Sequence, residues 1–151
     1  MENLDNIIAK VVASVKEENR ITLDTAKKLA EKVIAEAQRK DKKVVVAVVN
    51  EQGRPVLVEC MDGAFLVSFN VALKKAYTAV AVKSSTAALV PMVREGGALE
   101  GLQGEDSLLI LAGGEPLYKN GIIVGGVAVS GGTAAEDGEF AAYAANAFKT
   151  L

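Results

Sequence analysis

The sequence predicts an α/β domain in which an antiparallel sheet is flanked by helices. Two stretches, 43–60 and 108–132, place β-branched runs around glycine turns, as hairpins do. Helical periodicity occupies the segments before, between and after these hairpins. A chain of 151 residues with 50% hydrophobic and 24% charged residues has the length and composition of one ordinary soluble domain.

The first forty residues predict two helices. Residues 18–20 end the first, and Thr22 is placed to cap the second, which ends near Arg39. The apolar stripe of the first helix consists of Leu4, Ile7, Ile8, Val11, Val12 and Val15, and that of the second consists of Ala26, Leu29, Ala30, Val33, Ile34 and Ala37.

The two β-rich stretches predict turns at defined residues. In residues 43–60 the turn covers 50–54, where Gly53 supplies the positive φ of a tight turn. Residues 108–132 predict a strand, a Gly113–Gly114 turn, a short strand, an Asn120–Gly121 turn and a long strand. Asn-Gly between apolar runs is a strong hairpin signal.

Residues 64–83 predict a helix that is apolar around most of its circumference. Asn70, Lys74 and Thr78 form one narrow polar stripe at helical spacing. Such a helix is covered on several sides, by the sheet on one side and by a subunit interface or a ligand cavity on another. We therefore expect a closed, symmetric homo-oligomer in which this helix lies close to a subunit boundary.

Residues 84–97 predict a short capped helix that breaks or kinks near Val90, because Pro91 has no amide hydrogen to donate to the preceding turn. The glycine-rich segment 96–105 that follows is either an ordinary connection or a loop that faces a ligand.

Residues 124–137 combine an apolar strand, a glycine turn and a helix start, the arrangement that seats phosphate in nucleotide-binding proteins. Thr133 and Glu136 form a capping box, which occupies the amides that a phosphate would need. This disfavours a phosphate site. Gly125 and Gly126 instead permit close approach of another backbone or of a flat ligand. The last helix runs from Thr133 to about Phe148.

The composition argues against several partners and compartments. A net charge of −2 disfavours binding to nucleic acid or to an anionic membrane. No apolar run approaches the roughly 18–20 residues of a membrane span. A single cysteine, Cys60, excludes an intrachain disulfide, and residues 1–10 lack the features of a secretory leader, so we expect a cytoplasmic protein.

Several ordered motifs resemble the GlcG/HbpS family, whose members include the C-terminal domain of PduO-type adenosyltransferases. The resemblance covers about residues 21–151. We therefore interpret residues 1–151 as a single domain in which residues 1–20 are an N-terminal helical extension. The motifs are Met61-Asp62-Gly63-Ala64, Lys75-Ala76-Tyr77-Thr78-Ala79, Gly113-Gly114 with Pro116, Asn120-Gly121, and Val129-Ser130-Gly131-Gly132 with Glu136-Asp137.

The resemblance implies both a fold and a function. The implied fold is profilin-like, with an antiparallel sheet of about five strands flanked by helices, and it forms homo-oligomers. Several relatives bind haem, the family is often labelled haem-degrading, and its members are encoded near genes for glycolate, diol or glycerol catabolism. The expectation is an oligomeric accessory protein that binds a small molecule, with haem or another tetrapyrrole as the candidate cofactor.

The absence of histidine bears directly on that cofactor, because haem iron is usually held by His and otherwise by Cys, Met or Tyr. Cys60 stands where relatives often carry Arg, and both it and Met61 are expected to be core residues unless they bind a ligand. The other possible donors are Tyr77, Tyr118 and Tyr143, and no further metal site is predicted. The candidate ligand-binding residues are Met61, Asp62, Asn70, Lys74, Tyr77, Thr78, Gly113, Gly114, Glu136 and Asp137.

An enzyme acting on a small hydroxy acid or aldehyde is the alternative function. A lysine on an apolar helix can have a depressed pKa, and Lys74 could pair with Asp62 or Glu136 or bind a ligand carboxylate. Asp62 is expected to be the N-cap of the following helix, with a general base as its alternative role. No catalytic residue is assigned.

Overall fold

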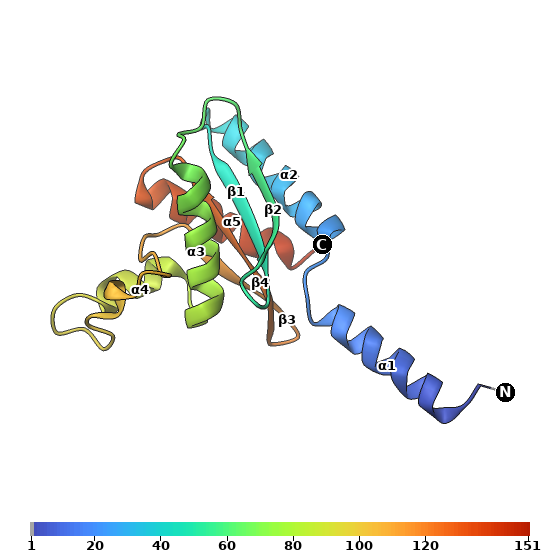
Figure 1. Cartoon of the computed structure of the whole chain (residues 1–151). Coiled ribbons are helices and arrows are strands. Elements are labelled where there is room, and N and C mark those ends of the chain that lie inside the picture. The colour runs from blue at the N-terminus through green and yellow to red at the C-terminus, as the bar shows by residue number, and fades with distance from the viewer. Residues whose placement is uncertain (1) are drawn as a thin grey trace.

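The computed structural model describes residues 2–151 and contains a single antiparallel sheet with helices on both faces (Figure 1). Five α-helices and one 3-10 helix accompany four strands over these residues. In chain order the elements are α1 (Leu4–Glu18), α2 (Leu23–Arg39), β1 (Val45–Asn50), β2 (Pro55–Cys60), α3 (Ser68–Val82), α4 (Thr86–Met92), η1 (Leu102–Gly104), β3 (Gly114–Lys119), β4 (Ile122–Ser130) and α5 (Ala134–Phe148).

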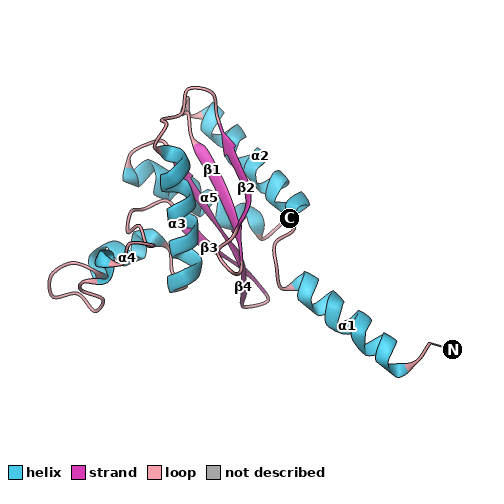
Figure 2. Cartoon of the chain, in the orientation of Figure 1, coloured by secondary structure: helices cyan, strands magenta, loops and turns pink. Residues whose placement is uncertain are grey.

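The sheet has the order β2-β1-β4-β3, so β2 and β3 are its edge strands. Alternate residues of β1 supply the two halves of the core, because successive strand side chains point to opposite faces. Val46 and Val48 pack with α2 and α5 on one face, whereas Val45 and Val49 pack with α3 on the other. Figure 2 shows the sheet between these two helical layers.

The structure confirms the α/β class with its antiparallel sheet but corrects the strand count from about five to four. Residues 108–112, predicted as a strand, form no regular element, and Gly114 begins β3 instead of turning the chain between two strands. The Leu109 amide donates to Thr78 Oγ1 at 2.9 Å, and Lys74 Nζ donates to the Asp106 carbonyl at 3.0 Å. Contacts with α3 therefore hold this segment away from the sheet.

Both predicted helix caps on the α2–α5 layer are confirmed. Thr22 accepts a hydrogen bond from the Thr25 amide, and Thr133 and Glu136 form the capping box at the start of α5. The positions of α3 and α4 differ from expectation. The α3 helix begins at Ser68 after Val67, so Asp62 is not its N-cap, and α4 continues through Pro91 to Met92 before it ends.

Gly125 and Gly126 of β4 lie in close contact with neighbouring elements. A Cβ on Gly125 would lie 2.4 Å from the Val49 carbonyl oxygen, and one on Gly126 would lie 2.9 Å from the Ala76 carbonyl oxygen of α3. Of the two roles predicted for these glycines, the structure thus shows the close approach of neighbouring backbone.

Helix α1 extends away from the rest of the domain (Figure 1). Its predicted apolar stripe is present but uncovered, and each of the six residues that form it is at least 44% exposed. Among the described residues, no helix has both the length and the apolar character required to cross a bilayer.

Candidate functional site

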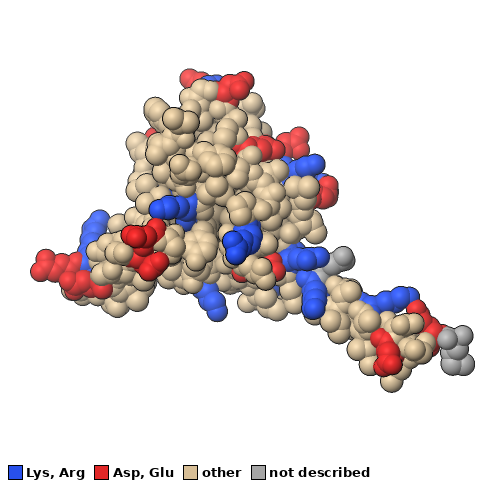
Figure 3. Space-filling view, in the orientation of Figure 1, with Lys and Arg blue, Asp and Glu red and all other residues tan. Residues whose placement is uncertain are grey.

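The surface formed by α3 and β2, here called the α3–β2 face, brings together three of the predicted ligand-binding residues. Asn70 and Lys74 are exposed on α3, and Tyr77 is half-buried. Lys74 and Tyr77 line a pocket of about 260 Å³ whose other walls are Leu73, Ser107, Gly53 of the β1–β2 turn and Pro55 at the start of β2. Figure 3 shows that the surface over α3 and β2 is largely uncharged.

The tyrosine in this pocket is positioned by a glycine. A Cβ on Gly53, whose φ is +74°, would lie 2.6 Å from Cδ2 of Tyr77, so glycine at this position lets the ring pack against the turn. The Gly53 amide donates to the Asn50 carbonyl, which holds the turn in place. The pocket therefore has a preformed aromatic wall.

The polar stripe of α3 has local hydrogen-bond partners. Thr78 donates to the Lys74 carbonyl at 2.7 Å and accepts from the Leu109 amide, so its hydroxyl is fully used. Lys74 donates to the Asp106 carbonyl and forms no ion pair within residues 2–151. Its predicted pair with Asp62 or Glu136 is therefore not formed, and the alternative, a contact with a ligand carboxylate, stays a prediction.

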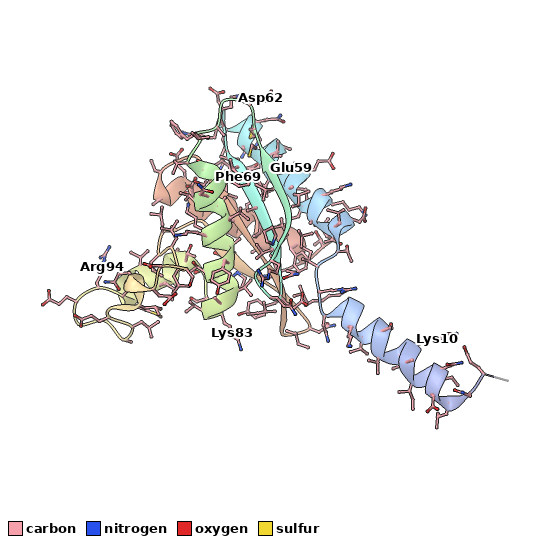
Figure 4. The ribbon with its side chains drawn as sticks, viewed as in Figure 1. Lys10, Glu59, Asp62, Phe69, Lys83 and Arg94 are labelled. Carbon is pink, nitrogen blue, oxygen red and sulfur yellow. The ribbon has the colours of Figure 1, made fainter. Side chains whose placement is uncertain are left out.

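Cys60 and a run of exposed apolar residues lie at the other end of this face. Cys60 is a free cysteine and is exposed, because it is the last residue of the edge strand β2. Its predicted place in the core is therefore wrong. Leu66 is 95% exposed, and Phe65, Val67 and Phe69 are also exposed. Figure 4 shows Asp62 at the tip of the loop after β2 and Phe69 below it, at the start of α3.

Met61 and Asp62 lie in a second hollow, the α2–β2 groove, which has a volume of about 480 Å³ and is lined by Ile34, Gln38, Lys43, Glu59, Cys60, Met61 and Asp62. Met61 packs against the core as expected, and its Sδ accepts from the Val44 amide at 3.4 Å. Asp62 is exposed. Glu59 and Asp62 bring negative charge to this groove, which makes it a poor site for an acidic ligand.

Three predicted residues, Gly113, Gly114 and Asp137, surround a residue that the sequence analysis did not select. Lys75 is completely buried, and its Nζ donates to Asp137 Oδ2 at 3.0 Å and to the Val129 carbonyl at 3.1 Å. The other oxygen of Asp137 accepts from the Gly132 amide at 2.8 Å. The cluster thus ties α3 to β4 and to the start of α5.

The two glycines leave room for this lysine. A Cβ on Gly113 would lie 2.7 Å from Lys75 Nζ, and one on Gly114 would lie 2.5 Å from the Lys75 carbonyl oxygen. Burial lowers the pKa of Lys75, and the carboxylate of Asp137 opposes that shift. Since the lysine is enclosed and bonded to β4 and α5, the structure indicates a structural role.

Glu136 lies apart from the other candidates. It accepts from the Thr133 amide and pairs with Lys42 at 2.6 Å on the surface. The Lys42 ammonium and the Thr133 amide lower the pKa of Glu136 to about 2. Nine of the ten candidates therefore divide among the α3–β2 face, the α2–β2 groove, the Lys75 cluster and this surface pair, and the tenth, Thr78, is buried.

A signal for Lys75 was present in the sequence. Lys74 and Lys75 are adjacent, and neighbours on a helix point about 100° apart, so on a helix covered on several sides one of the two is expected to point inward. Gly113 and Gly114 gave a second signal, because consecutive buried glycines indicate close approach of a neighbouring group.

Comparisons with known proteins agree with this fold. The family described as haem-degrading HbpS-like proteins matches residues 21–146. An uncharacterised 15.0 kDa protein from the dhaT–dhaS intergenic region of Citrobacter freundii is 39% identical over 133 residues, which span 87% of this chain and 94% of that protein. The corrinoid adenosyltransferase PduO of Salmonella typhimurium is 36% identical over 115 residues, which are 75% of this chain and only 34% of PduO.

Two solved structures are also similar. The protein ORFY of Klebsiella pneumoniae has a TM-score of 0.83 and 35% sequence identity, with 87% of this chain and 92% of ORFY covered. A complex of PduOC with haem has a TM-score of 0.80 and 34% identity, with 85% of this chain and 94% of PduOC covered.

Proposed function

Because this chain belongs to the HbpS-like family, we propose that it is an oligomeric accessory protein that binds haem or another tetrapyrrole. The haem complex of PduOC, a structural neighbour, supports this ligand class. We propose that the protein acts in the cytoplasm, in association with glycolate, diol or glycerol catabolism. We also propose that residues 1–20 extend a single domain.

The observation that carries the proposal is the α3–β2 face, which combines two possible iron donors with uncharged surface. Cys60 is an exposed thiol at one end of the face, where it also borders the α2–β2 groove, and Tyr77 lies in the pocket at the other end. Cys thiolate and Tyr are both known axial ligands of haem iron. In our proposal one of them holds the iron, Phe65 and Phe69 contact the ring, and Lys74 meets an acidic substituent.

A haem on this face needs more cover than one chain provides. The Tyr77 pocket has about 260 Å³, below the roughly 300–1,000 Å³ of sites that enclose a small ligand. The exposed apolar residues from Phe65 to Phe69, and the uncovered stripe of α1, are surfaces that a second copy would bury. We therefore propose a homo-oligomer whose partner subunit completes the face.

Titration of the apo-protein with haemin, followed by visible spectroscopy, tests the ligand class. We expect a saturable Soret band, and a parallel titration with cobalamin shows whether a corrinoid binds as well. If neither tetrapyrrole gives a saturable spectral change, the proposal is wrong.

Two variants identify the donor. Cys60→Ser removes the thiol and Tyr77→Phe removes the phenol oxygen, and we expect one of them to shift or abolish the haem band. Tyr143→Phe, a change on the exposed surface of α5, is the matched control and leaves the spectrum unchanged. A normal spectrum in both Cys60→Ser and Tyr77→Phe would contradict the ligand assignment.

Assembly is tested separately by light scattering. We expect a mass of at least two chains, and a mass of 15.7 kDa that does not change with concentration would exclude an oligomer. Val11→Asp places a charge on the exposed stripe of α1 and lowers the mass without unfolding the domain, because α1 does not pack on it. Asn6→Asp, on the opposite face of α1, leaves the mass unchanged.

A further inference from the structure

A pocket of about 310 Å³ lies between the link from α1 to α2, the β3–β4 turn and the end of α5. Ile21, Val124 and Phe148, which are 6%, 1% and 9% exposed, give it apolar walls. The Ile21 amide donates to the Val124 carbonyl at 3.0 Å, so the link is fixed against β4. The pocket is therefore a defined part of the domain and lies away from the α3–β2 face.

The exposed rim of this pocket is cationic. Arg20, Lys119 and Lys149 line it, one from each of the three segments, and no Asp or Glu side chain of residues 2–151 does so. None of the three forms an ion pair within the described part of the chain. Figure 3 shows Lys and Arg side chains gathered where α1 meets the domain.

Local backbone charge adds to this rim. The pocket includes Thr22 and Thr25 at the start of α2, where the helix dipole adds partial positive charge, although the Thr25 amide is already bonded to Thr22 Oγ1. The end of α5 brings partial negative charge, but the Lys149 and Thr150 amides cap the Ala147 carbonyl there. The three cationic side chains at the rim therefore favour an anion.

From this geometry we propose that the pocket binds a small organic anion with a carboxylate or phosphate head and an apolar body. The head lies at the rim between Lys119, Lys149 and Arg20, and the body contacts the walls formed by Val124 and Phe148. This site is independent of the tetrapyrrole proposed for the α3–β2 face.

Titrations of ¹⁵N-labelled protein, followed by amide chemical shifts, test the ligand class with three probes of equal chain length. We expect hexanoate and hexyl phosphate to bind saturably and to shift the amides of Ile21, Asn120 and Val124, and the tighter of the two identifies the preferred head. Hexanol, which lacks the charge, binds at least tenfold more weakly. Equal binding of hexanol, or shifts elsewhere only, would overturn the proposal.

Charge variants test the rim. The double change Lys119→Gln and Lys149→Gln weakens hexanoate binding at least tenfold, equivalent to about 1.4 kcal/mol. Lys27→Gln with Lys32→Gln removes the same charge from the exposed side of α2 and leaves affinity within twofold. An equal loss in both double variants would contradict a specific site. Cys60→Ser also leaves hexanoate binding unchanged, so this result stands apart from the haem titration.

Discussion

Two ion pairs at the start of α5 involve neighbouring acids but lie in opposite environments. Asp137 pairs with Lys75 at 3.0 Å, and both side chains are buried. Glu136, one residue earlier, pairs with Lys42 at 2.6 Å, and both side chains are about one third exposed or more. Distance alone does not separate a structural contact from a surface one, because the cost of losing a partner depends on whether water can replace it.

The buried pair gives the largest expected effect. Asp137→Ala leaves the Lys75 ammonium buried without its carboxylate, and we expect the free energy of unfolding to fall by about 3–5 kcal/mol. Urea denaturation measures this change. Glu139→Ala, an exposed residue on the same helix, changes the stability by less than about 0.5 kcal/mol.

A double variant sharpens the interpretation of that loss. Lys75→Met combined with Asp137→Leu removes both charges and keeps apolar volume, and replacing a buried pair in this way is often neutral or stabilising. We expect the double variant to be more stable than Asp137→Ala alone. A double variant less stable than Asp137→Ala would show that the loss in Asp137→Ala is not caused mainly by the lysine charge left without a partner.

The second-largest loss of stability is expected from a substitution that fills the space next to the buried pair. A Cβ on Gly114 would lie 2.5 Å from the Lys75 carbonyl oxygen, which is backbone and cannot rotate away. Gly114→Ala therefore displaces β3 from α3, and we expect a loss of about 1–3 kcal/mol in urea denaturation. Gly104→Ala is the matched control, because nothing lies within 4 Å of the Cβ that it adds. Equal stability of the two variants would show that β3 and α3 adapt to the methyl group.

The difference between the two pairs also shows what the sequence could predict. Local signals sufficed for Thr22 and for the Thr133–Glu136 capping box, since each depends on residues three positions apart. They sufficed for the α/β class and for the Asn120–Gly121 turn as well. Glu136 was therefore placed correctly as a capping residue.

Contacts between distant segments could not be predicted in the same way. Asp137 looked like a first-turn carboxylate, yet its partner Lys75 is 62 residues away. Residues 108–112 had strand-like composition, but the Thr78 hydroxyl holds the Leu109 amide beside α3. The sequence could indicate candidate site residues one by one. It could not predict that they would lie in separate parts of the molecule, because that depends on contacts between distant segments.

The exposed pair gives the smallest effect on stability, and titration measures it more directly than unfolding does. The Lys42 ammonium is the largest cause of the lowered pKa of Glu136, about 2 against an ordinary value of 4.5. Since the folded-state pKa lies below the unfolded one, the pair stabilises the fold above about pH 4.5, and this contribution is lost as the pH falls toward 2. Carboxyl ¹³C shifts of Glu136, recorded from pH 1.5 to 7, measure the pKa. Lys42→Met should raise the pKa of Glu136 towards 4.5. Lys27→Met, a change distant from Glu136, should leave it unchanged. An unchanged pKa in Lys42→Met would assign the shift to the Thr133 amide.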